Sequence, residues 1–257
     1  MVTLSVVLPA FNEERGIAAS ITRLAGFLGA QPGAATSWAS WEILVVDDGS
    51  GDRTAQAAQG ALPDDARLRV VRLPTHAGKG AAVKAGCAAA SGDAIVVTDV
   101  DLSYALESVS DAVAALASGA QMVTGDRRHP ESRIDRTLAA RAHASRRERI
   151  SLVFNLAVRL FYGLPWKDTQ CGLKAFTRES ASIIMPRLRT AGFLADIEMF
   201  LIAAGHGMKV ATIPVRLTWL SSDSTVHVVN QTPEVILDAL RIKWAQILRR
   251  YDRGSVP

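Results

Sequence analysis

The chain alternates short apolar runs with longer segments in which apolar residues recur every three or four positions. Runs of the first kind are typical of buried strands, and the second spacing is typical of amphipathic helices. The apolar runs predict strands at 3–8, 42–46, 68–73, 94–98, 121–124 and 208–215. The other segments predict helices that end near residue 29, begin after residue 50, and cover 81–90, 105–118, 150–162 and 233–251. This alternation predicts a mostly parallel sheet with helices on both faces.

Three polar clusters follow three of the predicted strands, at 9–14, 47–52 and 99–103. In open parallel sheets, ligands bind beyond the carboxyl ends of the strands. The clusters therefore predict one composite binding site. Two local roles are also predicted: Asn12 caps the first helix, and Ser50 caps the second.

Asp99 and Asp101 follow the strand at 94–98 with one residue between them. Side chains two apart on a strand point the same way, so these carboxylates converge unless the backbone turns sharply between them. Two close carboxylates repel unless a cation lies between them or one is protonated. A Mg²⁺ or Mn²⁺ ion that also holds a diphosphate meets this need. The alternative is a polar turn that caps the next helix.

The glycine motifs of two nucleotide-binding classes are missing. No G-x-G-x-x-G follows the first strand, which disfavours a dinucleotide-binding oxidoreductase. The segment 78–80 has a lysine between glycines but lacks the hydroxyl residue of a P-loop, which disfavours that class of NTPase.

Charge is divided unevenly along a chain whose length and 49% apolar content are those of a globular protein. Residues 1–126 carry 8 Lys and Arg against 14 Asp and Glu, whereas residues 127–257 carry 21 against 11. The basic half suits nucleic acid, an anionic membrane or a phosphorylated acceptor. Cys87 and Cys171 are the only cysteines, which indicates a reducing compartment without a disulfide framework.

Two segments of the basic half predict contact with a membrane or a partner. Residues 150–162 are apolar nearly all round, and residues 233–251 place apolar side chains on one side and basic ones on the other. The proposed apolar side of the second segment holds Ile236, Leu240, Trp244, Ile247 and Tyr251. Neither segment reaches the ~18 apolar residues that suggest a membrane span, and no signal peptide is visible. We expect interfacial helices, with a buried core helix as the alternative for 150–162.

A family resemblance narrows the function. The segments 7–14, 45–50 and 98–103 resemble the nucleotide-sugar half of GT-A glycosyltransferases of the inverting family 2. The segments 125–127, 168–174 and 193–198 resemble the dolichyl- and polyprenyl-phosphate glucosyl- and mannosyltransferases, the glucosyl branch most. The resemblance runs in order from about Ser5 to Trp219. It implies a GT-A fold in which residues 1–126 bind the nucleotide-sugar and residues 127–257 bind the acceptor and the membrane.

The resemblance also implies roles for individual residues. It assigns the nucleotide to Pro9, Ala10, Asn12, Glu14 and Asp47, with Asp48 beside Asp47. It assigns Mg²⁺ or Mn²⁺ to Asp99 and Asp101, with Ser103 as a further polar contact. Lys79 reaches the phosphates or Asp47, and Gln170 and Lys174 contact sugar or phosphate. Arg127 holds the acceptor phosphate, with Arg133 and Arg141 as weaker candidates, and Asp196 lies close to the reaction.

The implied reaction moves glucose from UDP-glucose to a polyprenyl phosphate with inversion. GDP-mannose as donor is one alternative. A hydroxyl acceptor in polysaccharide synthesis is another, and it needs a general base, for which Asp196 and Glu198 are the candidates. A catalytically silent binding module is the third. RNP-like aromatic motifs and zinc spacings are absent, so nucleic acid is not expected as a partner. We expect a cytoplasmic protein attached peripherally to the inner face of a membrane.

Overall fold

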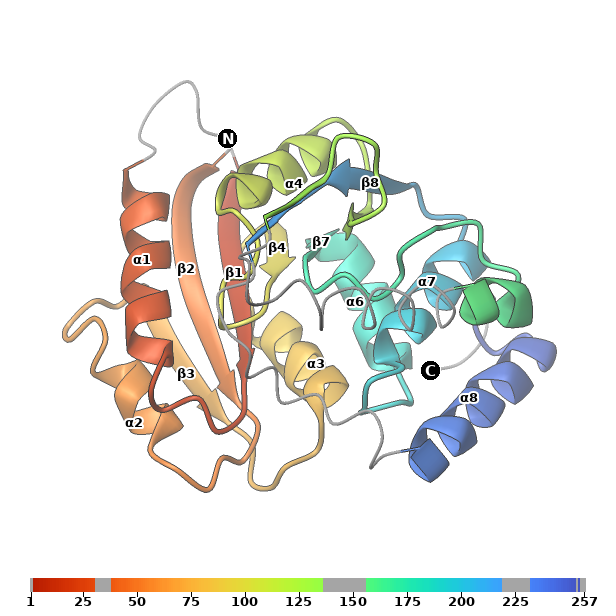
Figure 1. Ribbon diagram of the computed structural model, residues 1–257, viewed down its shortest axis with the longest axis horizontal. Helices are drawn as coiled ribbons and strands as arrows, with labels where there is room; N and C mark the ends of the chain where they lie inside the picture. The colour runs from red at the N-terminus through yellow and green to blue at the C-terminus, as the bar shows by residue number, and fades with distance from the viewer. Residues whose placement is uncertain (1, 31–37, 136–155, 219–231, 253, 255–257) are drawn as a thin grey trace.

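The computed structural model describes residues 2–30, 38–135, 156–218, 232–252 and 254, and it is built on a seven-stranded sheet (Figure 1). The strand order is β3-β2-β1-β4-β7-β5-β8. The strands are β1 (Val2–Ala10), β2 (Trp38–Asp47), β3 (Leu68–Arg72), β4 (Ala94–Val97), β5 (Met122–Asp126), β7 (Lys174–Thr177) and β8 (Val210–Pro214). Each predicted strand is present, which confirms a mostly parallel α/β sheet.

Within this sheet, the described strand that the sequence did not predict is β7, which lies antiparallel between β4 and β5. Lys174 is in register with Val97 on one side and with Thr124 on the other. All other neighbouring strands of this sheet run parallel. A lysine of the basic half is thus aligned with the strand end that precedes Asp99.

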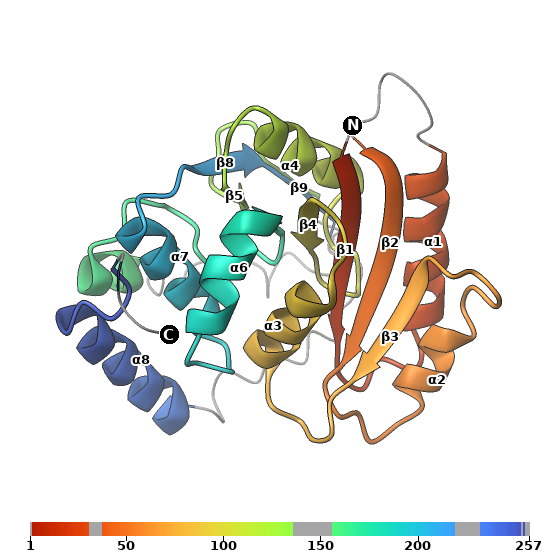
Figure 2. The ribbon, with the colours of Figure 1, turned by 180° about the vertical axis from the view of Figure 1, so that it is seen from behind.

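Helices cover both faces of the sheet, and each face has its own apolar core (Figures 1 and 2). One core joins the sheet to α1 (Ile17–Gly29), α2 (Thr54–Gln59) and α4 (Glu107–Ala117). The other joins it to α3 (Lys79–Ala89), α6 (Arg178–Arg187), α7 (Ala195–Gly205) and α8 (Thr232–Ile247). Alternate residues of β1 divide between the cores, with Val6 in the first and Val7 in the second, as the pleat requires.

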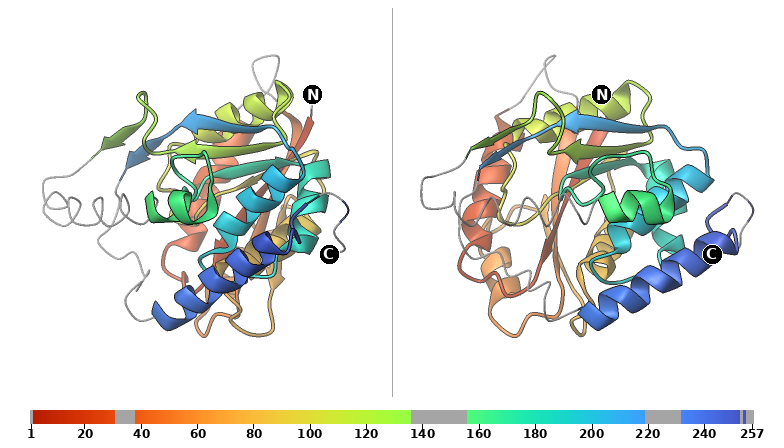
Figure 3. Two further views of the ribbon diagram at one scale, coloured as in Figure 1. Left: turned by 90° about the vertical axis from the view of Figure 1, so that its right-hand side faces the viewer. Right: turned by 45° about the vertical axis from the view of Figure 1, so that its right-hand side comes forward.

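A second sheet of two parallel strands, β6 (Arg133–Asp135) and β9 (Arg216–Thr218), lies beyond β8 (Figure 3). Figure 3 also shows helix 156–162 beside α8. Three hydrogen bonds join the two helices, among them the Tyr162 hydroxyl to the Ala239 carbonyl at 2.9 Å and the Lys243 ammonium to the Phe161 carbonyl at 2.7 Å. The remainder of the predicted helix, residues 150–155, lies outside the described residues.

Helix 156–162 and α8 share an exposed apolar face. On helix 156–162, Val158 and Tyr162 are buried, whereas Leu156, Leu160 and Phe161 are exposed. The alternative prediction of a buried core helix is therefore correct for only one side of this helix. On α8 the exposed apolar side chains are Ile236, Leu237, Leu240, Trp244 and Ile247, followed by Leu248. Tyr251 was wrongly predicted on this face, because it is buried against α7. None of the described helices is both long and apolar enough to cross a bilayer.

Candidate functional site

The loops after β1 and β2 are joined by hydrogen bonds at the carboxyl edge of the sheet. The backbone N–H of Asn12 donates to the Ser50 hydroxyl at 2.9 Å, and that of Gly51 donates to the Asn12 side-chain oxygen at 3.0 Å. Asn12 has φ +56°, a left-handed conformation that asparagine tolerates. Both capping predictions are therefore wrong. Helix α1 begins at Ile17 and α2 at Thr54, too far along the chain for either side chain to cap them.

The residues around Asn12 complete this joint. Glu14 accepts the Arg53 N–H at 3.0 Å, which fixes the loop from the other side. Pro9 and Ala10 end β1, and the Ala10 carbonyl accepts the N–H of Asp48 at 2.9 Å. The structure thus brings together four of the residues that the sequence assigned to the nucleotide, on a rim that backbone hydrogen bonds hold in place.

Asp47 and Asp48 are adjacent and buried but have different partners. Asp47 accepts the Ser50 N–H at 2.9 Å, and its other oxygen lies 3.3 Å from the Arg72 guanidinium. Asp48 accepts the N–H groups of Ala77 and Gly78 at 2.9 and 2.8 Å. Asp48 therefore positions the loop before α3. Asp47 keeps one oxygen that has no hydrogen bond within the described residues and can accept one from a base or ribose.

Asp99 lies among cations. The backbone turns sharply after it, with the Leu102 N–H bonded to the Asp99 carbonyl at 3.0 Å, so Asp99 and Asp101 do not simply converge. The Asp99 carboxylate is paired with the ammonium of Lys79, so in this structure Lys79 meets Asp99 and not Asp47. Burial favours the neutral acid, but Lys79, with Lys174 and Arg127 farther off, holds the pKa of Asp99 below its usual range.

Asp101 lies in a more acidic environment than Asp99. It is exposed, and it accepts the N–H and the hydroxyl of Ser103, so Ser103 orients Asp101. Burial and then the charges of Asp101, Asp52 and Asp99 raise the pKa of Glu13. A cluster of acids, of which Asp99 alone is paired with a lysine, fits a hard divalent cation. The described residues contain no group of three or more His, Cys, Asp or Glu side chains arranged for a metal. The donor set therefore suits an ion held by one or two carboxylates plus diphosphate and water, as is usual for Mg²⁺.

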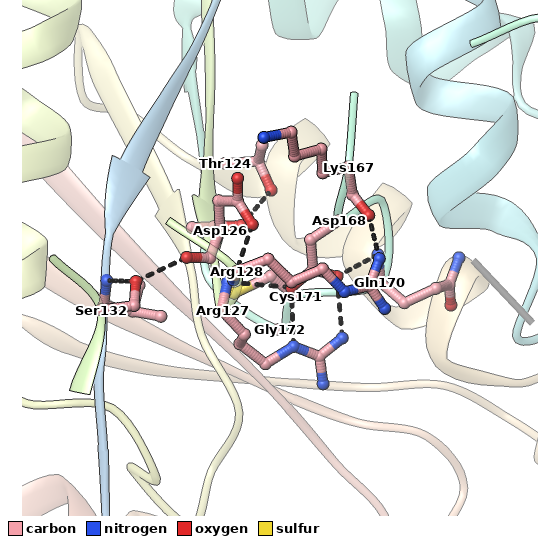
Figure 4. A network of polar contacts seen from close by, with 12 residues as sticks. Thr124, Asp126, Arg127, Arg128, Ser132, Lys167, Asp168, Gln170, Cys171 and Gly172 are labelled. Atoms are coloured by element: carbon pink, nitrogen blue, oxygen red, sulfur yellow. Dashed lines mark hydrogen bonds and ion pairs between the residues drawn. The ribbon is translucent and has the colours of Figure 1, made fainter. Parts of the chain in front are cut away.

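Arg127, directly after β5, is held by a carboxylate from a distant segment (Figure 4). Its Nε and Nη2 donate to the two oxygens of Asp168 at 2.7 and 2.8 Å, and its backbone N–H donates at 3.1 Å. Asp168 is fully buried, whereas the Arg127 side chain is 27% exposed. Although burial alone lowers it, the pKa of Arg127 is raised by the hydrogen bond to Asp168. The sequence assigned Arg127 to the site but gave Asp168 no role.

Lys174 and Asp196 form a third pair of opposite charges. The buried Lys174 ammonium lies 3.1 Å from Asp196 and donates to the Cys171 carbonyl at 2.6 Å. Gln170 belongs to the same segment, and both polar atoms of its side chain are buried without a hydrogen-bond partner among the described residues. Such an amide is suited to meeting a ligand. Arg133 begins β6, a strand of the second sheet, and Arg141 lies outside the described residues.

Glu198 has a structural environment. It is fully buried and accepts the N–H groups of Arg189 and Thr190 at 3.0 and 2.8 Å and the Tyr251 hydroxyl at 2.7 Å. A carboxylate with these donors ties the loop before α7 to the chain after α8. The prediction that Glu198 is a candidate base is therefore not supported by its geometry.

An apolar pocket of about 520 Å³ lies beside the start of α7. Leu194 and Ile197, which flank Asp196 in the sequence, line it together with side chains of helix 156–162 and of α8. The pocket therefore lies near the charged site and adjoins the exposed apolar face.

Sequence reasoning missed four residues that contact this site. Tyr104 accepts the Gly172 N–H at 3.1 Å, and Arg72 reaches Asp47 from the neighbouring strand. Phe11 stacks on His76, with ring centroids 3.9 Å apart. The contact of Arg72 with Asp47 was predictable from the order of the strands. Arg72 ends β3 and Asp47 ends β2, and these two parallel strands are neighbours. The others depend on loop conformation, for which the sequence has no periodic signal.

Comparison with known proteins gives a consistent result. The family model described as Glycosyl transferase family 2 matches residues 5–182. A dolichyl-phosphate beta-glucosyltransferase of Trichomonas vaginalis is 31% identical over 216 residues, which cover 82% of this chain and 62% of that one. The Saccharomyces cerevisiae dolichyl-phosphate beta-glucosyltransferase is 28% identical, with 96% of this chain and 76% of that one covered. The chain thus spans less than two thirds of the Trichomonas relative.

Among solved structures, glucosyl-3-phosphoglycerate synthase from Mycobacterium tuberculosis in complex with UDP superposes with a TM-score of 0.66. It is 24% identical, and the match covers 94% of this chain and 80% of that one. Another structure of that enzyme contains Mn²⁺, UDP and glucosyl-3-phosphoglycerate and gives a TM-score of 0.64. These likenesses show that the two proteins share a fold.

Proposed function

Because this chain belongs to glycosyl transferase family 2, we propose that it moves glucose from UDP-glucose to a polyprenyl phosphate with inversion at the sugar carbon. The observation that carries the proposal is a set of three cations, each paired with a carboxylate of the site: Lys79 with Asp99, Lys174 with Asp196, and Arg127 with Asp168. Lys79, Lys174 and Arg127 suit a site that holds a diphosphate and a phosphate at once. The names of the curated relatives support glucose and a dolichyl phosphate as the substrate classes.

The nucleotide-sugar half of the proposal uses the joined loops. Asp47 accepts from the base or ribose, and Pro9, Ala10, Asn12 and Glu14 form the rim around them. We propose a Mg²⁺ or Mn²⁺ ion on Asp101 and Asp99, with Ser103 as the residue that orients Asp101. When bound, such an ion neutralises the departing diphosphate. Lys79 lies close enough to Asp99 to share that charge.

The acceptor half of the proposal uses cations instead of a base. A phosphate monoester ionises near pH ~6, so it is already an anion at neutral pH and needs no residue to remove a proton. Arg127 keeps three N–H groups beyond those bound to Asp168, and these can hold the phosphate. Gln170 is positioned for the sugar or phosphate. A hydroxyl acceptor needs a free base, yet Asp196 is paired with Lys174 and Glu198 accepts three hydrogen bonds.

The assay is direct. Radiolabelled UDP-glucose with polyprenyl phosphate and Mn²⁺ should give a solvent-extractable product that wild-type protein forms and EDTA suppresses. GDP-mannose and a soluble polysaccharide acceptor serve as comparison substrates. If label is transferred only from GDP-mannose, the donor is GDP-mannose and not UDP-glucose. If label is found only in water-soluble product, the acceptor is a hydroxyl and not a lipid phosphate.

Asp196→Asn separates the two kinds of acceptor. With a phosphate acceptor, the change should lower kcat only severalfold, because it disturbs Lys174 without removing a base. With a hydroxyl acceptor, it should remove the ~10²- to 10⁴-fold contribution of general-base catalysis and flatten the acid limb of the pH profile. The pH dependence of kcat for both proteins decides between them.

The membrane part of the proposal concerns the apolar face shared by helix 156–162 and α8. Basic side chains border it, namely Arg241, Lys243, Arg249 and Arg250. Apolar side chains bordered by cations suit an anionic lipid surface such as the inner leaflet of a cell membrane. The apolar pocket adjoins this face, and Leu194 and Ile197 in its lining are near Asp196 in the sequence, so the pocket suits the first part of a polyprenyl chain.

Vesicle co-sedimentation tests the membrane contact. The protein should bind vesicles containing phosphatidylglycerol, less as salt rises, and Trp244→Glu should reduce the bound fraction strongly. Arg23→Gln, an equal change of charge at an exposed position of α1, is the control and should bind like wild type. Equal binding by wild type and Trp244→Glu would rule out this face.

A further inference from the structure

Asp168 makes more contacts with Arg127 than an exposed ion pair usually does. Its carboxylate accepts Nε, Nη2 and the backbone N–H of Arg127 and, at 3.2 Å, the N–H of Gln170 (Figure 4). Two parallel hydrogen bonds to one guanidinium fix the plane of the group as well as its position. Because Asp168 is fully buried, it is not available to a substrate.

The alternative partner for Arg127 is the carboxylate at the centre of the site. The Asp99 carboxylate lies against the segment that contains Asp168, because a Cβ at Gly172, four residues farther along, would collide with it. Asp99 is already paired with Lys79. A flexible arginine at this place would be drawn to Asp99, where it would compete with Lys79 and with a divalent ion. The bidentate bond to Asp168 opposes that movement.

We infer that Asp168 is a positioning residue, which keeps the guanidinium of Arg127 turned to the acceptor phosphate and away from Asp99. The inference rests on the proposed function for the identity of the acceptor, but its effect on the metal site does not depend on that acceptor. Asp168 belongs to the segment between helix 156–162 and β7. This segment therefore contributes to substrate binding, but only through Arg127, because the Asp168 carboxylate is itself buried.

Kinetics of Asp168→Asn test the first consequence. The amide keeps the size of the side chain but cannot accept both guanidinium N–H groups, and losing one charged hydrogen bond should raise the acceptor KM by about tenfold. The donor KM should stay within about twofold, because the loops that hold the nucleotide are unchanged. Asp126→Asn is the matched control. Asp126 is also buried, at the end of β5. It accepts the backbone N–H of Arg128 and is not the carboxylate that holds the Arg127 guanidinium.

A double-mutant cycle tests whether Asp168 acts through Arg127. In an Arg127→Met background, Asp168→Asn should leave the acceptor KM unchanged, because the group that it positions is gone. An effect of the same size in both backgrounds would overturn the inference. If Asp168→Asn does not fold, Arg127→Lys replaces it, since lysine retains the charge but lacks the fork. An unchanged acceptor KM in Arg127→Lys would count against the inference equally.

Metal binding gives a readout without the acceptor. We expect Mn²⁺, measured by electron paramagnetic resonance in the presence of UDP, to bind Asp168→Asn about fivefold more weakly, because the released arginine adds a positive charge near Asp99. The double variant Arg127→Met/Asp168→Asn should regain the affinity of the wild type. If wild-type protein glucosylates no lipid phosphate, the proposed function fails while this comparison still decides the inference. Equal Mn²⁺ affinity in wild type and Asp168→Asn would overturn it.

Discussion

The two sides of the site are held in place in different ways. On the nucleotide side, Asn12, Ser50 and Asp48 bond to backbone N–H groups or to each other, so the loops are fixed by many neutral or singly charged hydrogen bonds. Where the two sides meet, and on the acceptor side, charged side chains form pairs: Asp99 with Lys79, Asp168 with Arg127, and Asp196 with Lys174. The nucleotide side also contains one such pair, Asp47 with Arg72, but its loops are joined mainly by hydrogen bonds to the backbone. A rim bonded to the backbone keeps its shape when the ligand leaves. The pairs of Asp99 with Lys79 and of Asp196 with Lys174 can exchange partners with an incoming phosphate, so this side is expected to respond to its ligand while Asp168 holds Arg127 in place.

The largest effect is expected where the two sides meet, at Asp101. Asp101→Asn removes one charge from the proposed cation site, and kcat/KM should fall ~100-fold or more, since metal stabilisation is worth several kcal/mol. Initial rates at saturating Mn²⁺ measure this loss. Asp111→Asn, on the exposed side of α4, is the control for charge and should be neutral. Turnover near that of wild type in Asp101→Asn with EDTA present would refute the metal assignment.

A smaller effect is expected from crowding the acceptor side without changing a charge. A Cβ at Gly172 would collide with the Asp99 carboxylate, so Gly172→Ala must displace the pair of Asp99 and Lys79. We expect a loss of kcat of about tenfold, comparable to one charged hydrogen bond. Gly26→Ala on α1 meets nothing within 4 Å and should leave the rates unchanged. Unchanged rates in Gly172→Ala would mean that the position of Asp99 does not matter for catalysis.

The smallest effect is a pH-dependent change of stability on the nucleotide side. Because burial and nearby acids raise the pKa of Glu13, its charged form costs stability, and that cost appears as the pH rises above about 4.5. Glu13→Gln removes the cost, so the Tm of this variant should exceed that of wild type by about 1 °C at pH 7. The difference should vanish below pH ~4, where the carboxyl is protonated in both states, and should shrink with Mn²⁺. A pH-independent difference would exclude Glu13 from the acidic cluster.

The sequence predicted the strand ends well, because each apolar run stops where a polar cluster begins. Asp47 and Asp99 therefore lie where expected, at the carboxyl ends of β2 and β4, which flank β1 in the sheet. It did not predict β7, whose four residues carry a buried lysine and too short an apolar run to indicate a strand. It missed α6 too, although Thr177 precedes that helix and accepts the Ser180 N–H, a capping signal that was readable.

Partners were harder to predict than positions. The sequence assigned Asn12 and Ser50 to capping because such residues often bond to the nearest helix, yet here each bonds to the other's loop. It assigned Arg127 to the site by motif position but could not pair it with Asp168, since nothing local links two residues from separate segments. The division of the chain at residue 126 and the roles of the site residues stay predictions.

The antiparallel strand β7 also has a consequence for how the protein is made. In the described sheet, β5 and β8 connect to β4 only through β7, so the sheet cannot be completed before residues 174–177 leave the ribosome. Until then, β4 is an edge strand formed entirely of buried residues, Ala94 to Val97. An open apolar edge is a template for pairing with another chain. A nascent chain that stalls before residue 174 should therefore be aggregation-prone, and it should need a chaperone more than the finished protein does.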